Sequence, residues 1–385
     1  MPPLVINLRD ADDQRDVVHR AVQALAEGKL VVFPTETVYG VAASALNSDA
    51  VERLLAVKAR KSGHPLTIAI KSADDALDYV PDILPTASRL ARRCWPGPLT
   101  LVLDDSHPDS VVRKLPSKVQ EAVSPCGTIG LRVPSHPVTM SVLRLSPGPL
   151  VLTSANQAGN DDPIDAKQAV AELGNDVDLI LDDGRSRFAQ PSSVVQIDIN
   201  GMKVLRAGVY SAKQLQRLAS RMVLFVCTGN TCRSPMAEAL MRARLAQKLK
   251  CDVHQLEDRG VMINSAGIAA MTGGRASPES VEVMNERDLD LKNHHSQPLT
   301  DSLVRFADMM LTMTRSHREA ILSEWPEAAS RTALLSHDGT DVADPIGGGV
   351  EFYRRCAKQI ETQLDEWIDQ LGLIEPGDTL GKEVT

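Results

Sequence analysis

Residues 223–240 read VLFVCTGNTCRSPMAEAL, and this stretch decides the fold of the second half of the chain. It opens with an apolar run that is typical of a buried strand. It continues through a short polar loop at 227–234 and becomes helical near Pro235, a residue type suited to a first helical turn. The backbone N–H groups of such a loop and the start of the next helix converge on one point. The sequence therefore predicts an anion-binding loop between a strand and a helix.

Two side chains give this loop a chemistry beyond anion binding. Cys227 ends the strand, where a helix N-terminus and a nearby arginine lower the pKa of a thiol and favour the nucleophilic thiolate. Arg233 can bind two oxygens of a phosphoryl group at once. A free cysteine in an ordinary glycine turn is the alternative, but the strand before the loop and the helix after it favour a phosphate site.

A thiolate that attacks a phosphoryl group needs a proton donor for the leaving group. The acidic, glycine-rich segment 339–353 supplies two carboxylates before the last predicted helix. We expect Asp344, next to Pro345, to be this donor, and Asp341 to be a solvated or helix-capping residue. Taken alone, Asp-Pro-Ile-Gly-Gly would be only a turn.

The segments around the loop alternate between the two kinds of secondary structure, which is typical of a doubly wound parallel sheet. We predict strands at 222–227, near 261–264, at 309–313 and near 332–335, and helices at 235–249, 277–287, 315–323 and 350–371.

The first 210 residues also mix strands and helices, which indicates an α/β or α+β domain with a large sheet. Residues 48–60 form a predicted capped helix, and 211–221 a short helix or linker. We predict strands at 65–70, 99–103, 128–133, 149–155 and 192–199, and a strand that enters a polar turn within 28–40.

Polar groups gather where these strands end. They include the PTETVYG turn (34–40), the cation pair Lys58 and Arg60, Arg132 and the TSAN segment (153–156). Each alone could be a turn or a helix cap. Together they could bind a triphosphate and a small carboxylate. The GxxxxGK[ST] motif does not occur, so a nucleotide site here would not be a P-loop.

Composition excludes several classes of protein. The 385 residues carry a net charge of -8 and only 3% aromatic residues, which argues against a basic nucleic-acid coat and against wide base-stacking platforms. The six cysteines follow no disulfide framework, and no apolar run approaches the length of a membrane span. We expect a cytoplasmic protein with reduced thiols and no membrane contact.

Residues 222–372 resemble the low-molecular-weight protein phosphatases along their whole length. CTGNTCRS resembles the catalytic loop of that family, and NSAG (264–267) and NHHS (293–296) resemble its Ser-Ala-Gly and histidine elements. The resemblance implies Cys227 as the nucleophile that forms a phosphocysteine, Arg233 as the transition-state clamp and Asp344 as general acid and then base. It implies no cofactor. The phosphate-loop and supporting residues it implies are Thr228, Gly229, Asn230, Thr231, Cys232, Ser234, Ser265 and His294.

Two positions resemble the protein-arginine-phosphatase subgroup. Tyrosine-specific members usually carry a bulky aliphatic residue where this loop has Thr231, and aromatic residues where Ile346 and glycines follow the Asp-Pro pair. A polar residue at 231 could favour a guanidinium group over a phenyl ring. We therefore predict phosphoarginine as the substrate, with phosphotyrosine as the alternative.

The ordered motifs of residues 10–215 resemble the YrdC-like threonylcarbamoyl-AMP synthases. FPTETVYG, KxR, WPGPLT, GLRVP, TSAN, PSSVV and LRAG carry the resemblance. It implies a twisted mixed sheet with helices. It also implies synthesis of threonylcarbamoyl-AMP from L-threonine, bicarbonate and ATP, with Mg²⁺ accompanying ATP, for threonylcarbamoyl-adenosine formation in tRNA.

The same resemblance assigns site residues and partners. Thr35 and Arg132 would hold threonine, and no residue is predicted to ligate a metal directly. Double-stranded RNA binding, and tRNA or tRNA-modification proteins as partners, are further expectations. The residues that would hold the ATP phosphates or the reacting carbamate are Lys58, Arg60, Ser154, Asn156, Ser193 and Arg206.

The chain is thus predicted to be a bifunctional α/β enzyme. A synthase domain spans 1–215, a phosphatase domain that acts on phosphoproteins spans 222–372, and 373–385 is a polar tail. The alternatives are a C-terminal protein-tyrosine phosphatase and an N-terminal RNA- or nucleotide-binding module without synthase activity.

Overall fold

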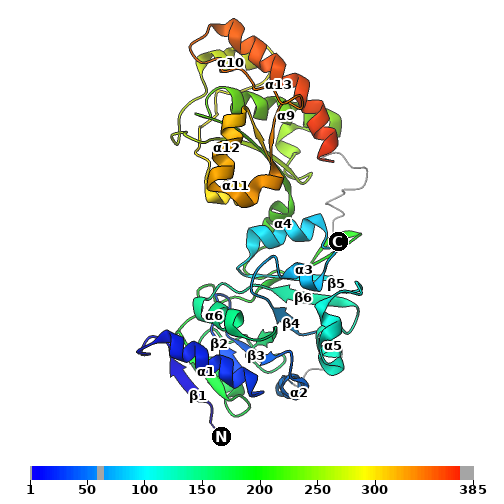
Figure 1. Ribbon diagram of the computed structural model, residues 1–385, viewed down its shortest axis with the longest axis vertical. Coiled ribbons are helices and arrows are strands. Elements are labelled where there is room, and N and C mark those ends of the chain that lie inside the picture. Colours follow the sequence, from blue (N-terminus) through cyan, green and yellow to red (C-terminus); the bar gives the residue numbers. More distant parts are fainter. Residues whose placement is uncertain (1, 59–64, 373–385) are drawn as a thin grey trace. The chain divides into compact units, whose positions relative to one another are not determined.

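The computed structural model describes residues 2–58 and 65–372. The chain forms two compact units, Met1–Leu215 and Gln216–Thr385, each with its own sheet (Figure 1). The boundary falls inside α8 (Ala212–Ala219), in the segment that the sequence predicts as a short helix or linker. The predicted polar tail at 373–385 lies outside the described residues.

The N-terminal unit is built on a ten-stranded sheet. Its strands are β1 (Leu4–Asn7), β2 (Val31–Phe33), β3 (Gly40–Ser44), β4 (Thr67–Ala69), β5 (Leu99–Asp104), β6 (Thr128–Arg132), β7 (Leu150–Ser154), β8 (Leu179–Asp182), β9 (Ser193–Asp198) and β10 (Gly201–Arg206). The strand order is β1-β8-β2-β3-β7-β4-β6-β5-β9-β10. Because β1 runs parallel to β8 while β3 is antiparallel to β2 and β7, the sheet is mixed, as expected.

Side-chain caps start several helices of this unit. Asp13 accepts a hydrogen bond from the backbone of Arg15 before the first helix, and Asn47 accepts one from Ala50 before the second. The second helix ends at Val57, so that Lys58 is its C-cap residue. The helices are α1 (Gln14–Ala26), α2 (Ser48–Val57), α3 (Ala76–Tyr79), α4 (Pro85–Cys94), α5 (Ser117–Val123), α6 (Pro137–Leu145) and α7 (Ala166–Leu173), with the 3₁₀ turn η1 (Val111–Lys114).

The C-terminal unit holds a four-stranded sheet in which every pairing is parallel, in the order β12-β11-β13-β14. Strands and helices alternate along the chain, so the prediction of a doubly wound parallel sheet is confirmed. The strands are β11 (Arg221–Cys227), β12 (Val261–Gly267), β13 (Met309–Thr312) and β14 (Thr332–Leu334). The helices are α9 (Arg233–Leu249), α10 (Pro278–Asn285), α11 (Asp301–Phe306), α12 (Arg315–Glu324) and α13 (Val350–Gln370), with 3₁₀ turns η2 (Val253–Gln255) and η3 (Pro326–Arg331).

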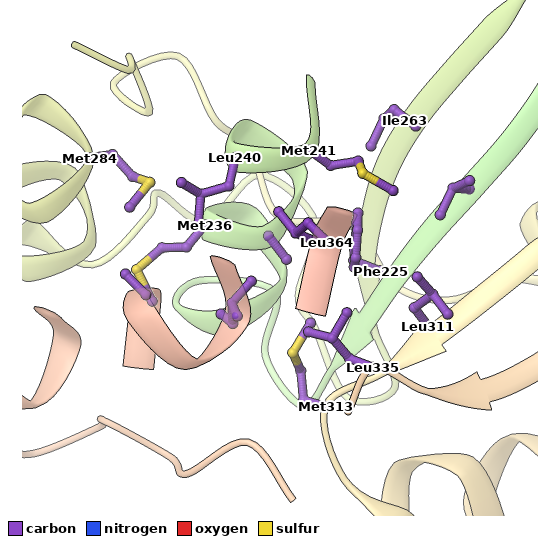
Figure 2. Close-up of a cluster of buried hydrophobic side chains, with 14 of the residues drawn as sticks. Phe225, Met236, Leu240, Met241, Ile263, Met284, Leu311, Met313, Leu335 and Leu364 are labelled. Atoms are coloured by element: carbon purple, nitrogen blue, oxygen red, sulfur yellow. The ribbon is translucent and has the colours of Figure 1, made fainter. Parts of the chain in front are cut away.

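Both faces of this sheet are covered. Along β11, Val223 and Phe225 belong to one buried cluster, whereas Leu224 and Val226 belong to another on the opposite face. Figure 2 shows Phe225 in the first cluster among apolar side chains of α9 and α13. Burial on both faces explains why the strand is a continuous apolar run rather than an alternating one.

Three elements of this unit differ from the predictions. The helix after the catalytic loop starts at Arg233, two residues early, so Arg233 and Ser234 belong to its first turn. β12 continues to Gly267, through a segment that the sequence presents only as a motif. α11 was not predicted, because it is a short helix of six residues whose start depends on a cap by Thr300.

Candidate active sites

The predicted catalytic loop lies between β11 and α9. Asn230 adopts a left-handed backbone conformation with φ of 54°, which asparagine tolerates better than most residues. The loop also passes very close to the end of β12. A Cβ on Gly267 would lie 2.5 Å from the backbone oxygen of Thr228 and 2.9 Å from the backbone N of Asn230, so only glycine fits there.

The thiol of Cys227 is buried and hydrogen-bonded inside this loop. Its Sγ lies 3.3 Å from the backbone N of Asn230 and 2.9 Å from Ser234 Oγ. Both groups can donate to a thiolate, and the N-terminus of α9 adds its positive end. The thiol that the sequence predicts as the nucleophile therefore lies among hydrogen-bond donors.

A hydrogen-bond network fixes Asn230. Its side-chain amide donates to Ser234 Oγ at 2.9 Å and to Ser265 Oγ at 2.8 Å. Its backbone oxygen lies 2.8 Å from His294 Nε2. The predicted loop residues and the two remote predicted residues, Ser265 and His294, thus lie together.

Two members of this network were not predicted. Ser265 donates to the Glu238 carboxylate at 2.7 Å, and the backbone N–H of Gln297 donates to Asn230 Oδ1 at 2.9 Å. Burial raises the pKa of Glu238, against the opposing effects of Ser265 and Arg242. A carboxylate among apolar helix residues was the available signal for Glu238. Gln297 also donates from its side-chain amide to the backbone oxygen of Ser265 at 2.9 Å, and a single glutamine in a polar segment gave no signal of either contact.

Arg233 and Asp344 meet at the mouth of the loop. Arg233 is buried and its Nη2 donates to Asp344 Oδ2 at 2.5 Å, while the side chain of Asp344 is 44% exposed. The other terminal nitrogen of Arg233, Nη1, lies 3.3 Å from the backbone oxygen of Val342. Asp341 instead accepts from the backbone N–H of Arg315 at the start of α12, which is the capping role expected for it.

The remaining predicted residues of the loop flank the nucleophile. Cys232 is buried, with Sγ 3.5 Å from Tyr353 Oη and 3.5 Å from Ser277 Oγ. Thr231 is partly exposed, and its backbone oxygen accepts from the N–H of Ser277. Thr228 is exposed, with Oγ1 2.9 Å from Nε2 of His317, a further residue that the sequence did not indicate.

A cavity of about 370 Å³ lies in the N-terminal unit. Side chains of β4, β5, β7 and β9 contribute to its lining, so it spreads over several neighbouring strands of the sheet. Thr35, Arg132, Ser154 and Arg206 line it as predicted site residues.

Thr35 and Arg132 are linked through the PTETVYG turn. Arg132 Nη2 donates to Glu36 Oε1 at 2.7 Å and to Thr37 Oγ1 at 2.8 Å, and Thr37 Oγ1 lies 2.8 Å from Thr35 Oγ1. Burial opposes ionisation of Glu36, but Arg132 and the N–H of Ser135 outweigh it and lower its pKa. The result is a buried guanidinium with one carboxylate partner, beside two hydroxyl groups.

Lys58 holds the TSAN segment from outside the cavity lining. Its Nζ donates to the backbone oxygen of Ser154 at 2.9 Å, to Asn156 Oδ1 at 2.7 Å and to the backbone oxygen of Asn156. Lys58 therefore does not line the cavity itself, but it holds Ser154, which does. Its predicted companion Arg60 lies outside the described residues.

Arg206 binds a neighbour of the predicted serine. Its Nη2 lies 3.1 Å from Ser192 Oγ, and Ser192 lines the cavity. Ser193 is buried, and its hydroxyl donates to the backbone oxygen of Tyr210 and accepts from the N–H groups of Gly208 and Tyr210. Ser193 thus holds the loop at residues 208–210, whereas Ser192 lines the cavity.

The described residues contain neither a candidate metal cluster nor a candidate membrane-spanning helix. Over residues 2–58 and 65–372, no three His, Cys, Asp or Glu side chains are grouped so that they could hold a metal ion. Among the helices of these residues, none has the length and apolar composition that a membrane crossing requires.

Models of two protein families match the chain. The Sua5/YciO/YrdC model, described as telomere recombination, matches residues 23–208. The low molecular weight phosphotyrosine protein phosphatase model matches residues 222–375.

The N-terminal unit has curated relatives. A threonylcarbamoyl-AMP synthase of Pyrococcus abyssi is 33% identical over 215 residues, which are 56% of this chain and 60% of the relative. A Mycobacterium tuberculosis protein, provisionally named threonylcarbamoyl-AMP synthase, is 35% identical over 206 residues, 54% of this chain and 90% of the relative. The chain thus spans less than two thirds of the longer relative and nearly all of the shorter one.

Relatives of the C-terminal unit include a phosphatase of known substrate class. The protein-arginine-phosphatase of Bacillus subtilis is 37% identical over 153 residues, 39% of this chain and 95% of the relative. Among solved structures, P. abyssi Sua5 complexed with L-threonine matches with a TM-score of 0.50 and 23% identity, over 68% of this chain and 92% of that one. At that identity the match supports the fold alone.

Proposed function

The chain belongs to the Sua5/YciO/YrdC family through residues 23–208 and to the low-molecular-weight phosphatase family through residues 222–375, and we propose that it is a bifunctional enzyme. The N-terminal unit synthesises threonylcarbamoyl-AMP and the C-terminal unit hydrolyses phosphoproteins. Each activity has its own group of polar side chains in its own unit.

In the proposed synthase, the amine of L-threonine and bicarbonate form a carbamate with loss of water. A carbamate oxygen attacks the α-phosphorus of ATP, and the bond to pyrophosphate breaks. The observation that carries this proposal is the cavity lined by Thr35, Arg132 and Ser154. Arg132 binds the threonine carboxylate and Arg206 faces the phosphates or the carbamate, while Lys58 holds Ser154 and Asn156 in place.

Mg²⁺ accompanies ATP in this proposal. It prefers to keep several waters and is commonly held by substrate phosphates, so it needs few protein ligands. Asp162 in the cavity lining offers a carboxylate to that water shell. The product would then serve tRNA modification in the cytoplasm, and tRNA, double-stranded RNA and tRNA-modification proteins are the proposed partners.

Release of pyrophosphate tests the synthase. With the full chain, ATP and Mg²⁺, pyrophosphate release should require both L-threonine and bicarbonate. Release that is independent of either compound, or absent with both, would leave an RNA- or nucleotide-binding module as the better account of this unit.

In the proposed phosphatase, Cys227 Sγ attacks the phosphorus and the bond to the leaving group breaks, while Asp344 delivers its proton to the leaving atom. Asp344 then takes a proton from a water molecule that attacks the phosphocysteine, and phosphate and the free thiolate form. The observation that carries this proposal is the thiol within hydrogen-bond reach of Asn230 N and Ser234 Oγ. Arg233 turns from Asp344 to the phosphoryl oxygens when substrate binds.

We propose phosphoarginine as the substrate. Thr231 places a small polar side chain beside the nucleophile, and the arginine phosphatase of B. subtilis covers nearly the whole unit. Phosphotyrosine is the second candidate, because the matching family model is named for it. The kcat/KM values for matched phosphoarginine and phosphotyrosine peptides, with Cys227→Ser as blank, decide between them.

A further inference from the structure

His317 is a buried histidine that the proposed reaction does not use. It lies in the first turn of α12 and is 4% exposed. Its Nε2 lies 2.9 Å from Thr228 Oγ1, in the residue that follows the nucleophile. Its Nδ1 lies 2.8 Å from Thr314 Oγ1, the cap of its own helix.

The groups around the His317 ring determine its charge and the hydrogen bonds that its two nitrogens can make. Burial, followed by the charge of Arg233, lowers the pKa of His317 to about 4, so the ring is neutral at physiological pH. A neutral imidazole donates one hydrogen bond and accepts one. Thr314 Oγ1 accepts the backbone N–H of His317 and also lies 2.9 Å from Ser316 Oγ. In the tautomer that is protonated at Nε2, Nδ1 accepts from Thr314 and Nε2–H donates to Thr228; the opposite tautomer keeps both contacts with the roles exchanged.

The turn at residues 313–317 also binds the acid loop, the segment 339–349 that contains Asp344. Arg315 donates its backbone N–H to Asp341 Oδ1 at 2.9 Å. The backbone of Met313 accepts from the N–H of Val342 at 2.8 Å and donates to the oxygen of Val226 at 3.1 Å. Residues 313–317 therefore contact the strand that ends at the nucleophile, the catalytic loop and the loop of the general acid.

We propose that His317 is a positioning residue. Through Thr228 it fixes the catalytic loop against the turn that carries the acid loop, and so sets the distance at which Asp344 protonates the leaving group that Cys227 displaces. This inference rests on the proposed phosphatase reaction and adds a residue to it.

Its signature is a dependence on the leaving group. A guanidine needs the proton of Asp344 as it departs, whereas p-nitrophenolate departs readily as the anion. A loop that is fully folded but shifted should therefore lose more activity on a phosphoarginine peptide than on p-nitrophenyl phosphate. A change that merely unfolds part of the protein lowers both activities by the same factor.

Two replacements at position 317 separate its two contacts. The amide of His317→Gln reaches roughly the place of Nε2 and can still bind Thr228, whereas that of His317→Asn reaches only the place of Nδ1. At position 228, Thr228→Ser keeps the hydroxyl and Thr228→Val removes it. His254→Gln, at an exposed histidine of η2, is the matched control.

We expect His317→Asn and Thr228→Val to lower kcat/KM on the phosphoarginine peptide roughly tenfold or more, and their effects to be non-additive when combined. On p-nitrophenyl phosphate the loss should stay below about threefold. On the phosphoarginine peptide, His317→Gln should keep more activity than His317→Asn, and Thr228→Ser more than Thr228→Val. The control His254→Gln should keep wild-type activity on both substrates.

Equal losses on the two substrates, or equal behaviour of His317→Gln and His317→Asn, would overturn the proposal. If the wild-type chain does not act on phosphoarginine, that substrate assignment fails by itself. The same comparison then runs with a phosphotyrosine peptide, whose phenolate also needs a proton, and tests His317 independently.

Discussion

At the scale of single residues, the hydrogen-bond partners of Cys227 can stabilise a thiolate, which a thiol forms far more readily than a hydroxyl forms an alkoxide. Serine at this position would keep the contacts to Asn230 and Ser234, but its hydroxyl stays protonated at neutral pH, because these donors lower its pKa far too little. We expect Cys227→Ser to lower phosphatase kcat by roughly 10³-fold or more. Cys251→Ser, at a partly buried cysteine just after α9, should keep wild-type activity, and a phosphatase that survives Cys227→Ser would exclude the covalent mechanism.

Thr231 carries the argument for the substrate. Its hydroxyl lies 3.6 Å from the thiol of Cys232, and the side chain is partly exposed in the loop that contains Cys227. An isoleucine would replace the polar group with an apolar surface that suits a phenyl ring better than a guanidinium group. We expect Thr231→Ile to shift the ratio of kcat/KM values toward phosphotyrosine peptides by roughly tenfold. An unchanged ratio would remove Thr231 from the account of specificity.

At the scale of elements, the strand–loop–helix geometry of residues 223–240 could be predicted because it is local in sequence. The proposed nucleophile and clamp, Cys227 and Arg233, both lie inside this window. Gln297 and His317 could not be predicted, because parallel topology brings their segments to the loop from two other elements. A sequence pattern indicates which face of a helix or strand is buried. The contacts of Gln297 with Asn230 and of His317 with Thr228 form only when separate elements pack together.

The position of the serine at the start of β9 shows the same limit on a smaller scale. Successive side chains of a strand point to opposite faces, so two adjacent serines have different surroundings. Ser193 holds the 208–210 loop, whereas Ser192 contacts Arg206 at the cavity. The two serines are adjacent and identical, so nothing in the sequence distinguishes their roles.

The stability of the C-terminal unit should depend on pH because of His317, which lies in the first turn of α12. Because the pKa of His317 is lowered to about 4, the unfolded chain binds a proton near pH 6.5 while the folded chain does not. The stability that this neutral ring provides is fully present above pH 6.5 and is lost as pH falls toward 4.

Hydrogen exchange can measure this effect in the full chain. Protection of amides in α12 and the catalytic loop, corrected for intrinsic exchange rates, should fall between pH 6.5 and 4.5. The fall should be smaller in His317→Asn. An NMR titration that gave His317 a pKa near 6.5 would contradict this expectation.

At the scale of the whole molecule, two units with separate sheets carry two separate sets of polar groups. The synthase residues lie within Met1–Leu215 and the phosphatase residues within Gln216–Thr385, and each unit buries a core of its own. The proposed reactions share no intermediate, because hydrolysis of a phosphoprotein is no step in making an adenylate. A change in one site should therefore leave the other activity intact.

Lys58→Met provides a conservative test of this independence. Methionine keeps much of the length and apolar volume of the lysine stem but removes the ammonium group that binds Ser154 and Asn156. The TSAN segment loses its anchor at the cavity, and we expect threonine-dependent pyrophosphate release to fall by roughly 100-fold. Phosphatase kcat/KM should stay within about twofold of wild type, since no group of that site is touched. A parallel loss of both activities in Lys58→Met, or of pyrophosphate release in Cys227→Ser, would mean that the two sites are energetically coupled.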